Sequence, residues 1–150
     1  MKCSGDCLRD CIHDDCCNRD MKKKHIKYFN MASLNAYKSN MDKNYGAVLV
    51  YNNNIIGIGH NHSIDYITRT QNYVSKERKI LHNIHAEHDA IIDAIKNGNK
   101  KLISKSSIYI SRVLNDYYTC DEIIFQRAVP CENCKKLIEK YKIRKTYYIY

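Results

Sequence analysis

The hydrophobic residues of this chain change their spacing along the sequence, and these changes mark the predicted elements. At Lys22–Ser39 apolar residues such as Phe29 and Ala32 return at roughly helical intervals, which predicts an amphipathic helix. The next two apolar runs, Lys43–Tyr51 and Asn54–His60, are short and rich in branched side chains, as is typical of strands. The asparagines at their junction suit a tight turn, so the sequence predicts a β-hairpin.

The second half of the chain predicts two helices that each follow a strand or loop. From His85 onward apolar residues mark one face of a helix that stops near Asn97–Gly98. The single proline, Pro130, directly precedes the other helix. The remaining predicted elements are a short helix near Lys76–Leu81, strands at Ser106–Val113 and Lys145–Tyr150, and a short strand near Glu122–Phe125. This order predicts an α/β fold with helices packed on a central sheet.

The composition fits one globular domain with an N-terminal appendage. Hydrophobic residues make up 44% of the 150 residues, which is enough to bury a substantial core. Residues 1–20 are rich in cysteine and poor in large apolar side chains, so we expect a cysteine-rich extension there and the main domain at residues 21–150. The sequence offers no signal peptide and no apolar stretch long enough to cross a bilayer. We therefore expect an intracellular, cytoplasmic protein without a membrane partner.

The formal net charge of +9 comes largely from lysine, with clusters at Met21–Phe29 and Cys134–Lys145. Such an excess could attract phosphate-bearing partners. The chain is also rich in Asn, Ile and Tyr, however, and AT-rich coding produces the same bias without any requirement for binding. The charge therefore leaves nucleic acid as an open partner, but not the favoured one.

Four residues at the starts of the two later helices could form a three-ligand metal site with a carboxylate beside it. His85 and Glu87 lie in "HAE", and Cys131 and Cys134 lie in "PCENC". Two cysteines at this spacing can offer both sulfurs to one ion, and the positive end of the helix dipole favours their thiolates. With one histidine nitrogen they make a three-ligand zinc site that leaves a fourth position for water. The glutamate could then take the proton of that water.

Each half of this pattern also has a plainer interpretation. His85 could begin a helix without any ligand role, and the cysteine pair could be a redox dithiol or half of a zinc finger. Finger ligands cluster locally, whereas His85 lies far along the chain from Cys131. That separation suits one site built from two helices, so the combination favours the zinc site.

The combination H-x-E with P-C-x-x-C resembles the signature of zinc deaminases. From about Ala32 to Tyr150 the chain resembles the cytidine and deoxycytidylate deaminase superfamily. The stretch "YGAVLVYNNNIIGIGHN" is similar to the family's first hairpin, which ends in Gly-x-Asn, here Gly59 to Asn61. The resemblance implies a three-layer α/β/α cytidine deaminase-like fold with a central mixed sheet. The family's usual last helix and strand have no counterpart before Tyr150, so we expect a fold that is truncated at its C-terminal end.

The resemblance also implies a role for individual residues. It implies Zn²⁺ as the cofactor and Glu87 as the catalytic proton carrier. The zinc ligands would be His85, Cys131 and Cys134. Asn61 would hydrogen-bond the base or sugar of the substrate, and the backbone of Ala86 would contact the base. For Asn61 the alternative is a turn asparagine that caps the end of a strand.

The implied reaction is the hydrolytic deamination of a cytosine nucleoside or nucleotide (cytidine, deoxycytidine, CMP or dCMP) to its uracil form, with release of ammonia. A small pyrimidine is therefore the favoured partner, and a homo-oligomer is left open. One alternative is a deaminase of bases in tRNA or single strands. The other is a non-catalytic zinc-binding module, which would have no use for Glu87. Asp89 departs from many deoxycytidylate-type members, which carry asparagine there.

The cysteines of the extension leave three interpretations open. Cys3, Cys7 and Cys11 are spaced to share one face of a helix, and with neighbouring ligands they could bind a second zinc. The neighbouring candidates are His13, Cys16 and Cys17. The alternatives are a disulfide clip and an exposed, oxidation-prone tail.

Overall fold

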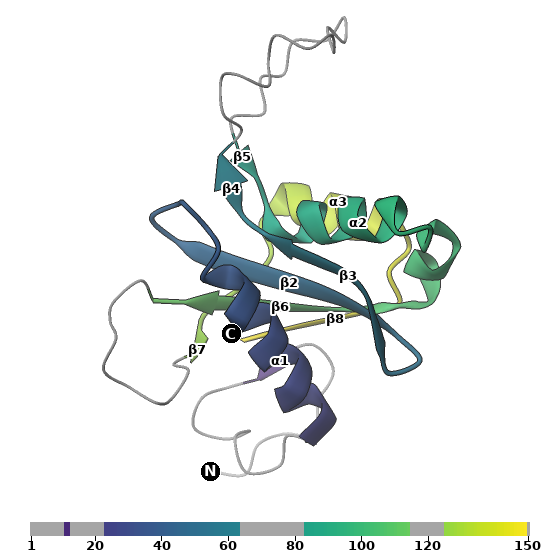
Figure 1. The fold of residues 1–150 in the computed structure, drawn as a ribbon, viewed down its shortest axis with the longest axis horizontal. Coiled ribbons are helices and arrows are strands. Elements are labelled where there is room, and N and C mark those ends of the chain that lie inside the picture. Colours follow the sequence, from purple (N-terminus) through teal and green to yellow (C-terminus); the bar gives the residue numbers. More distant parts are fainter. Residues whose placement is uncertain (1–10, 13–22, 64–82, 115–124, 150) are drawn as a thin grey trace, which may run out of the picture.

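A mixed β-sheet with helices on both faces forms the body of the protein (Figure 1). The computed structural model describes residues 11–12, 23–63, 83–114 and 125–149. The strands of the sheet are β1 (Cys11–Ile12), β2 (Asn44–Tyr51), β3 (Asn54–His60), β6 (Ser107–Val113), β7 (Phe125–Gln126) and β8 (Lys145–Ile149). Their order is β1-β8-β6-β2-β3, with β7 also paired to β6. Parallel pairs join β8 to β1 and β6, and antiparallel pairs join β2 to β3 and β6, which confirms the predicted mixed sheet.

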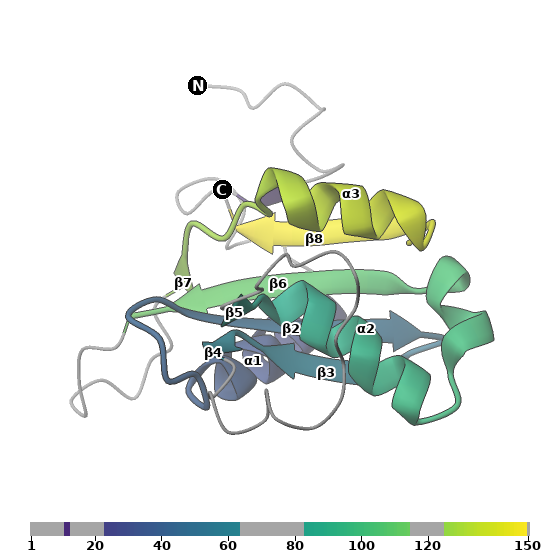
Figure 2. The ribbon, with the colours of Figure 1, turned by 90° about the horizontal axis from the view of Figure 1, so that it is seen from above.

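The helices divide the molecule into three layers. Helix α1 (Lys23–Ala36) covers one face of the sheet, and α2 (Ala86–Lys96) and α3 (Glu132–Lys140) cover the other (Figure 1). Figure 2 shows that α2 runs over β3 and that α3 runs over β8. A 3₁₀ helix, η2 (Lys100–Lys105), follows α2, and a separate two-stranded sheet pairs β4 (His62–Ser63) with β5 (Asn83–Ile84). The predicted α/β/α architecture is confirmed.

The side chains of β2 alternate between the two faces of the sheet, which explains why there is a hydrophobic core on each face. Val48 and Val50 pack with Phe29 on the α1 side, whereas Ala47 and Leu49 pack with the helices of the opposite face. Successive side chains of a strand point to opposite faces, so a strand covered on both sides reads as a continuous apolar run. The run in Lys43–Tyr51 has this form, and it is the centre of the fold.

The β2–β3 hairpin confirms the predicted turn. Asn52 and Asn53 have positive φ angles of 47° and 64°, and Tyr51 pairs directly with Asn54. Two central residues with positive φ define the turn whose twist matches a β-hairpin, and asparagine tolerates this conformation better than most residues. Asn54 itself belongs to β3 and not to the turn.

Three polar side chains form hydrogen bonds with the backbone of β3 along the edge that no other described strand of the sheet covers. Backbone groups on an edge strand need partners, and covering them also prevents pairing with another chain. Helix α2 and the turn after it supply these partners. The bonds run from Ile58 N to Asp93 Oδ2 (2.9 Å), from His60 N to Asp89 Oδ2 (3.0 Å) and from Asn99 Nδ2 to Ile56 O (3.1 Å). Asp89 and Asp93 are four residues apart on one helix face, so α2 is aligned along the strand edge.

Gly59 allows β3 to approach the backbone of α2 closely. A Cβ at this position would meet Ala90 N and Ala86 O of the helix. We expect Gly59→Ala to lower the free energy of unfolding by about 3 kcal/mol, the upper end of the usual cost of overpacking, because backbone atoms cannot rotate away as a side chain can. Urea unfolding of the purified variant measures this change.

Gly98 provides the matched control for this substitution. It has a φ of 78°, and an added Cβ would meet nothing within 4 Å. Gly98→Ala should therefore cost only the strain of a left-handed backbone, about 1 kcal/mol. Equal losses in the two variants would contradict the close packing of α2 against β3.

Several elements differ from the sequence-based expectation or lie beyond it. Strand β1 was not predicted, and it places Cys11 in a strand, so a helix face through Cys3, Cys7 and Cys11 does not extend to it. The predicted strand near Glu122–Phe125 is found at Phe125–Gln126, and its residues 122–124 lie outside the described residues. The predicted helix near Lys76–Leu81 also lies outside them. Among the described helices, none has the length and apolar character needed to span a membrane.

Candidate metal centre and active site

The two helices of the α2–α3 face begin at the same end of the sheet (Figure 2). This end lies beyond the carboxyl ends of the parallel strands β6 and β8, a common location for ligand sites in α/β sheets. His85 is the N-cap of α2 and Cys131 is the N-cap of α3, and both have extended backbone conformations. Neither side chain caps its own helix, so both are available for other contacts.

The two cysteine sulfurs lie close to the same histidine nitrogen. His85 Nδ1 is 3.5 Å from Cys131 Sγ and 3.3 Å from Cys134 Sγ. A tetrahedral zinc site with ordinary Zn–S and Zn–N bonds places a nitrogen and a sulfur about 3.5 Å apart. One imidazole nitrogen has a single proton or a single lone pair, so it cannot bond equally to two thiols. A shared cation accounts for both distances, and these residues could hold one.

Cys134 lies in a different environment from the other two residues. It is buried in the first turn of α3, whereas His85 and Cys131 are exposed. Burial raises the pKa of the Cys134 thiol, and the neighbouring Glu87 and Cys131 raise this pKa further. The thiolate is the form that binds metal, so a cation that binds here must displace the thiol proton.

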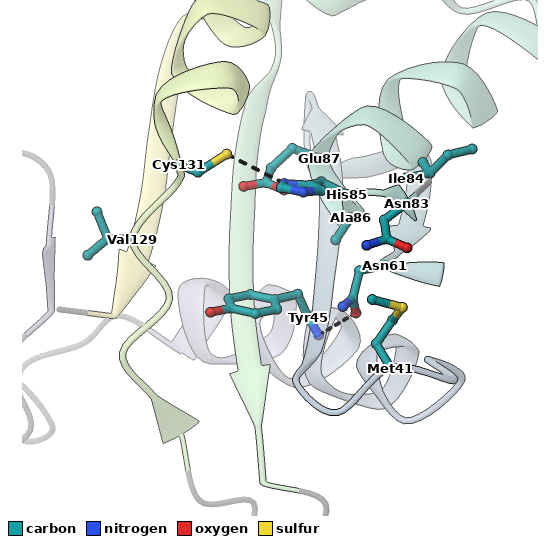
Figure 3. A pocket seen from close by; sticks show the side chains of 10 residues that line it. All are labelled: Met41, Tyr45, Asn61, Asn83, Ile84, His85, Ala86, Glu87, Val129 and Cys131. Atoms are coloured by element: carbon teal, nitrogen blue, oxygen red, sulfur yellow. Dashed lines mark hydrogen bonds between the residues drawn. The ribbon is translucent and has the colours of Figure 1, made fainter. Parts of the chain in front are cut away.

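Glu87 lies inside the cavity beside these residues. The residue is only 5% exposed, although it carries a carboxylate in the first turn of α2. The cavity has a volume of about 160 Å³. Its lining includes Tyr45, Asn61, Ile84, His85, Ala86, Glu87, Val129 and Cys131 (Figure 3). A buried carboxylate next to possible metal ligands can accept and release a proton in a space that excludes most water.

Asn61 lines the same cavity, but its amide already joins two strand ends. Its Oδ1 accepts a hydrogen bond from Tyr45 N (2.7 Å, Figure 3), and its Nδ2 donates to Lys43 O (2.6 Å). These bonds match the alternative role given for Asn61 in the sequence analysis, an asparagine that caps the end of a strand. A side-chain amide has a second lone pair and a second N–H, so Asn61 keeps one acceptor and one donor for a ligand.

Ala86 brings a backbone group to the cavity. It is the first residue of α2, and its side chain is fully buried. The N–H groups of the first helical turn have no acceptor within the helix. Ala86 lines the cavity beside Glu87 (Figure 3), so its N–H is a candidate donor for a ligand there.

Two residues of this region were not found from the sequence. Tyr45 lines the cavity, and the Arg112 guanidinium lies over its ring, 5.7 Å from the centroid. The period of two along β2 could have identified Tyr45, because it shares the face of Ala47. Asp89 was noted only as a departure from related sequences, yet it binds the backbone of β3 through His60 N.

Comparisons with known proteins give independent support for this interpretation. A family model described as the cytidine and deoxycytidylate deaminase zinc-binding region matches residues 22–150. The fold is similar to the dCMP deaminase from the cyanophage S-TIM5 in its apo form, with a TM-score of 0.57 and 21% identity over 85% of this chain and 84% of that one. The same enzyme in complex with dCMP and dUMP matches with a TM-score of 0.52 and 19% identity over 85% and 82% of the two chains.

No curated protein matches the sequence at a significant level. The family model, in contrast, covers most of the chain, including both predicted metal-binding motifs. The chain carries a zinc-binding region of the deaminase type, and its mixed α/β fold agrees with that assignment. This protein belongs to the cytidine and deoxycytidylate deaminase family.

Proposed function

We propose that this protein is a zinc-dependent hydrolase that converts a cytosine nucleoside or nucleotide to its uracil form and releases ammonia. One observation carries the proposal. His85 Nδ1 lies within 3.5 Å of the sulfurs of both Cys131 and Cys134, and Glu87 is buried in the adjoining cavity. A purely structural zinc site has no need for a buried carboxylate at this position.

His85, Cys131 and Cys134 would hold the metal in this proposal. Zinc bound by three protein ligands supplies an activated water at its fourth position. One nitrogen and two sulfur donors suit zinc, which is borderline in softness. Their distances match the edges of a tetrahedral site, which supports zinc over an octahedral cation such as Mg²⁺.

Glu87 would carry the protons of the reaction. Its carboxylate accepts a proton from the attacking water and delivers it to N3 of the cytosine ring. It then takes the second proton from the hydroxyl that has been added at C4 and passes it to the exocyclic nitrogen, which leaves as ammonia when its bond to C4 breaks. Water adds its oxygen at C4, so cytosine and water become uracil and ammonia. The low exposure of Glu87 keeps bulk water from competing for these transfers.

Asn61 and Ala86 would hold the base beside Glu87. The Ala86 N–H can donate to a base carbonyl, and Asn61 keeps one donor and one acceptor after its bonds to the strand backbone. The cavity of about 160 Å³ is smaller than the roughly 300–1,000 Å³ of ordinary small-molecule sites. This size suits a single pyrimidine ring, with the sugar directed toward the opening. The complex of the cyanophage enzyme with dCMP and dUMP supports a nucleotide as the substrate.

A substrate panel tests this proposal directly. We expect the zinc-loaded protein to release ammonia from at least one of cytidine, deoxycytidine, CMP and dCMP, and to leave single-stranded oligonucleotides and tRNA unchanged. The small cavity admits one base, whereas an enzyme that acts on polynucleotides also needs a groove for the flanking nucleotides. Ammonia assays and chromatography of the uracil product measure the reaction. Turnover of polynucleotides alone would favour an editing enzyme, and no turnover with zinc fully bound would favour a binding module.

A further inference from the structure

Next to Asn61, two histidines and an aspartate gather outside the proposed active site. His60 ends β3 and His62 begins β4, so they flank Asn61 in the sequence. Alternate residues of an extended chain share one side, which separates both histidines from the asparagine between them. Asp89 of α2 faces this pair, with Oδ2 3.7 Å from His60 Nδ1. One ligand atom from each residue lies within 4.8 Å of the others.

Hydrogen bonds hold His62 and Asp89 in fixed orientations, as second hydrogen bonds do for the side chains that bind metals. His62 Nδ1 lies 3.1 Å from the carbonyl oxygen of His60, and a carbonyl only accepts, so Nδ1 carries the proton. The lone pair of the neutral ring is then on Nε2. Histidine ligands commonly donate their other N–H to a backbone carbonyl in this way. Asp89 Oδ2 is fixed by the N–H of His60 (3.0 Å), so the carboxylate is oriented too.

We propose that His60, His62 and Asp89 form a second cation site, separate from His85 and the cysteines, that takes Zn²⁺ or a similar transition-metal ion. Two imidazoles and one carboxylate are common zinc ligands, and imidazole does not suit Ca²⁺ or Mg²⁺. The edges of a tetrahedral site with these donors measure about 3.4 Å. The two ring centroids lie 5.1 Å apart with their planes tilted by 42°, and the candidate ligand atoms lie within 4.8 Å of one another.

The cation would act on the active site through the backbone. It would join the end of β3, the start of β4 and the first turns of α2. His62 pairs with Ile84 in the β4–β5 sheet, directly before His85, and Asp89 lies one helical turn after His85. Asn61 stands between the two histidines. The site would therefore fix Asn61 and the start of α2 relative to each other, as a structural metal does.

Metal stoichiometry in paired variants tests the proposal. The protein, residues 1–150, is stripped with a chelator, dialysed against excess Zn²⁺, and analysed by elemental mass spectrometry. We expect His62→Ala and Asp89→Asn each to bind about one zinc equivalent less than the wild type. Asp89→Asn keeps an amide oxygen that can accept from His60 N, so it tests the carboxylate without removing that bond. His88→Ala is the matched control, since it removes a histidine of α2 that lies outside the cluster.

Cobalt substitution separates this site from the one at the cysteines. Co²⁺ bound by thiolates gives charge-transfer absorption, which a site of two histidines and one aspartate lacks. We expect His62→Ala and Asp89→Asn to keep this absorption at wild-type intensity while they lose the additional cobalt. Circular dichroism confirms that each variant is folded. The proposal would be overturned if both variants kept the wild-type metal content. It would also be overturned if Asp89→Asn alone bound as much metal as the wild type.

Discussion

Glu87→Gln is expected to lower kcat by about 1,000-fold, while the protein keeps its full zinc content. Glutamine has nearly the same shape as glutamate, so it fills the same buried position in the cavity. It cannot accept a proton at neutral pH, and proton transfer to the base would therefore stop. Ammonia release at saturating substrate measures the loss, and elemental analysis of the same sample measures the zinc.

Glu139→Gln is the control for this prediction. Glu139 is an exposed glutamate near the end of α3, so its neutralisation makes the same change in net charge. We expect it to leave both kcat and zinc content unchanged. If Glu87→Gln kept more than about a tenth of wild-type kcat, Glu87 could not be the proton carrier.

Cys134→Ser is expected to remove both the zinc of the proposed active site and all measurable turnover. A serine hydroxyl is not deprotonated as a thiol is, and it is a poor ligand for zinc. Because a metal bound only by the folded state stabilises it, the loss of zinc should also lower the free energy of unfolding. Zinc content, ammonia release and urea unfolding measure the three effects.

Metal-free protein provides the control for the stability effect. If the variant is less stable because it lacks zinc, chelator treatment should remove most of the difference in the free energy of unfolding between wild type and Cys134→Ser. The difference that remains is the cost of a hydroxyl at a buried position, about 1 kcal/mol. A Cys134→Ser protein with wild-type zinc content and turnover would contradict the proposed ligand set.

The sequence predicted those parts of the fold that depend on local signals. The β2–β3 hairpin follows from asparagines that accept positive φ angles, and both are found in that conformation. Helix α2 ends at Lys96, where Gly98 with its φ of 78° stops the helical pattern. The motifs at the starts of α2 and α3 also indicated that residues distant in sequence would share one site, and the structure brings His85 to both cysteines.

The features that the sequence did not predict depend on pairing between distant segments. Two-residue strands such as β1 carry too few positions for any periodic pattern, so only the neighbouring β8 identifies β1. The roles of Asp89 and Asp93 depend on which strand lies at the edge of the sheet, and a local pattern does not contain that information. The same holds for His60 and His62, whose proximity to Asp89 arises only when α2 packs along β3.

The anomalous scattering of a zinc-loaded crystal tests the central claim most directly. Data collected on both sides of the zinc absorption edge locate the metal without any assumption about its ligands. We expect a peak about 2.0–2.1 Å from His85 Nδ1 and about 2.3 Å from the sulfurs of Cys131 and Cys134, with the Glu87 carboxylate beside it in the cavity. A stoichiometric zinc content without a peak between these three residues would contradict the account.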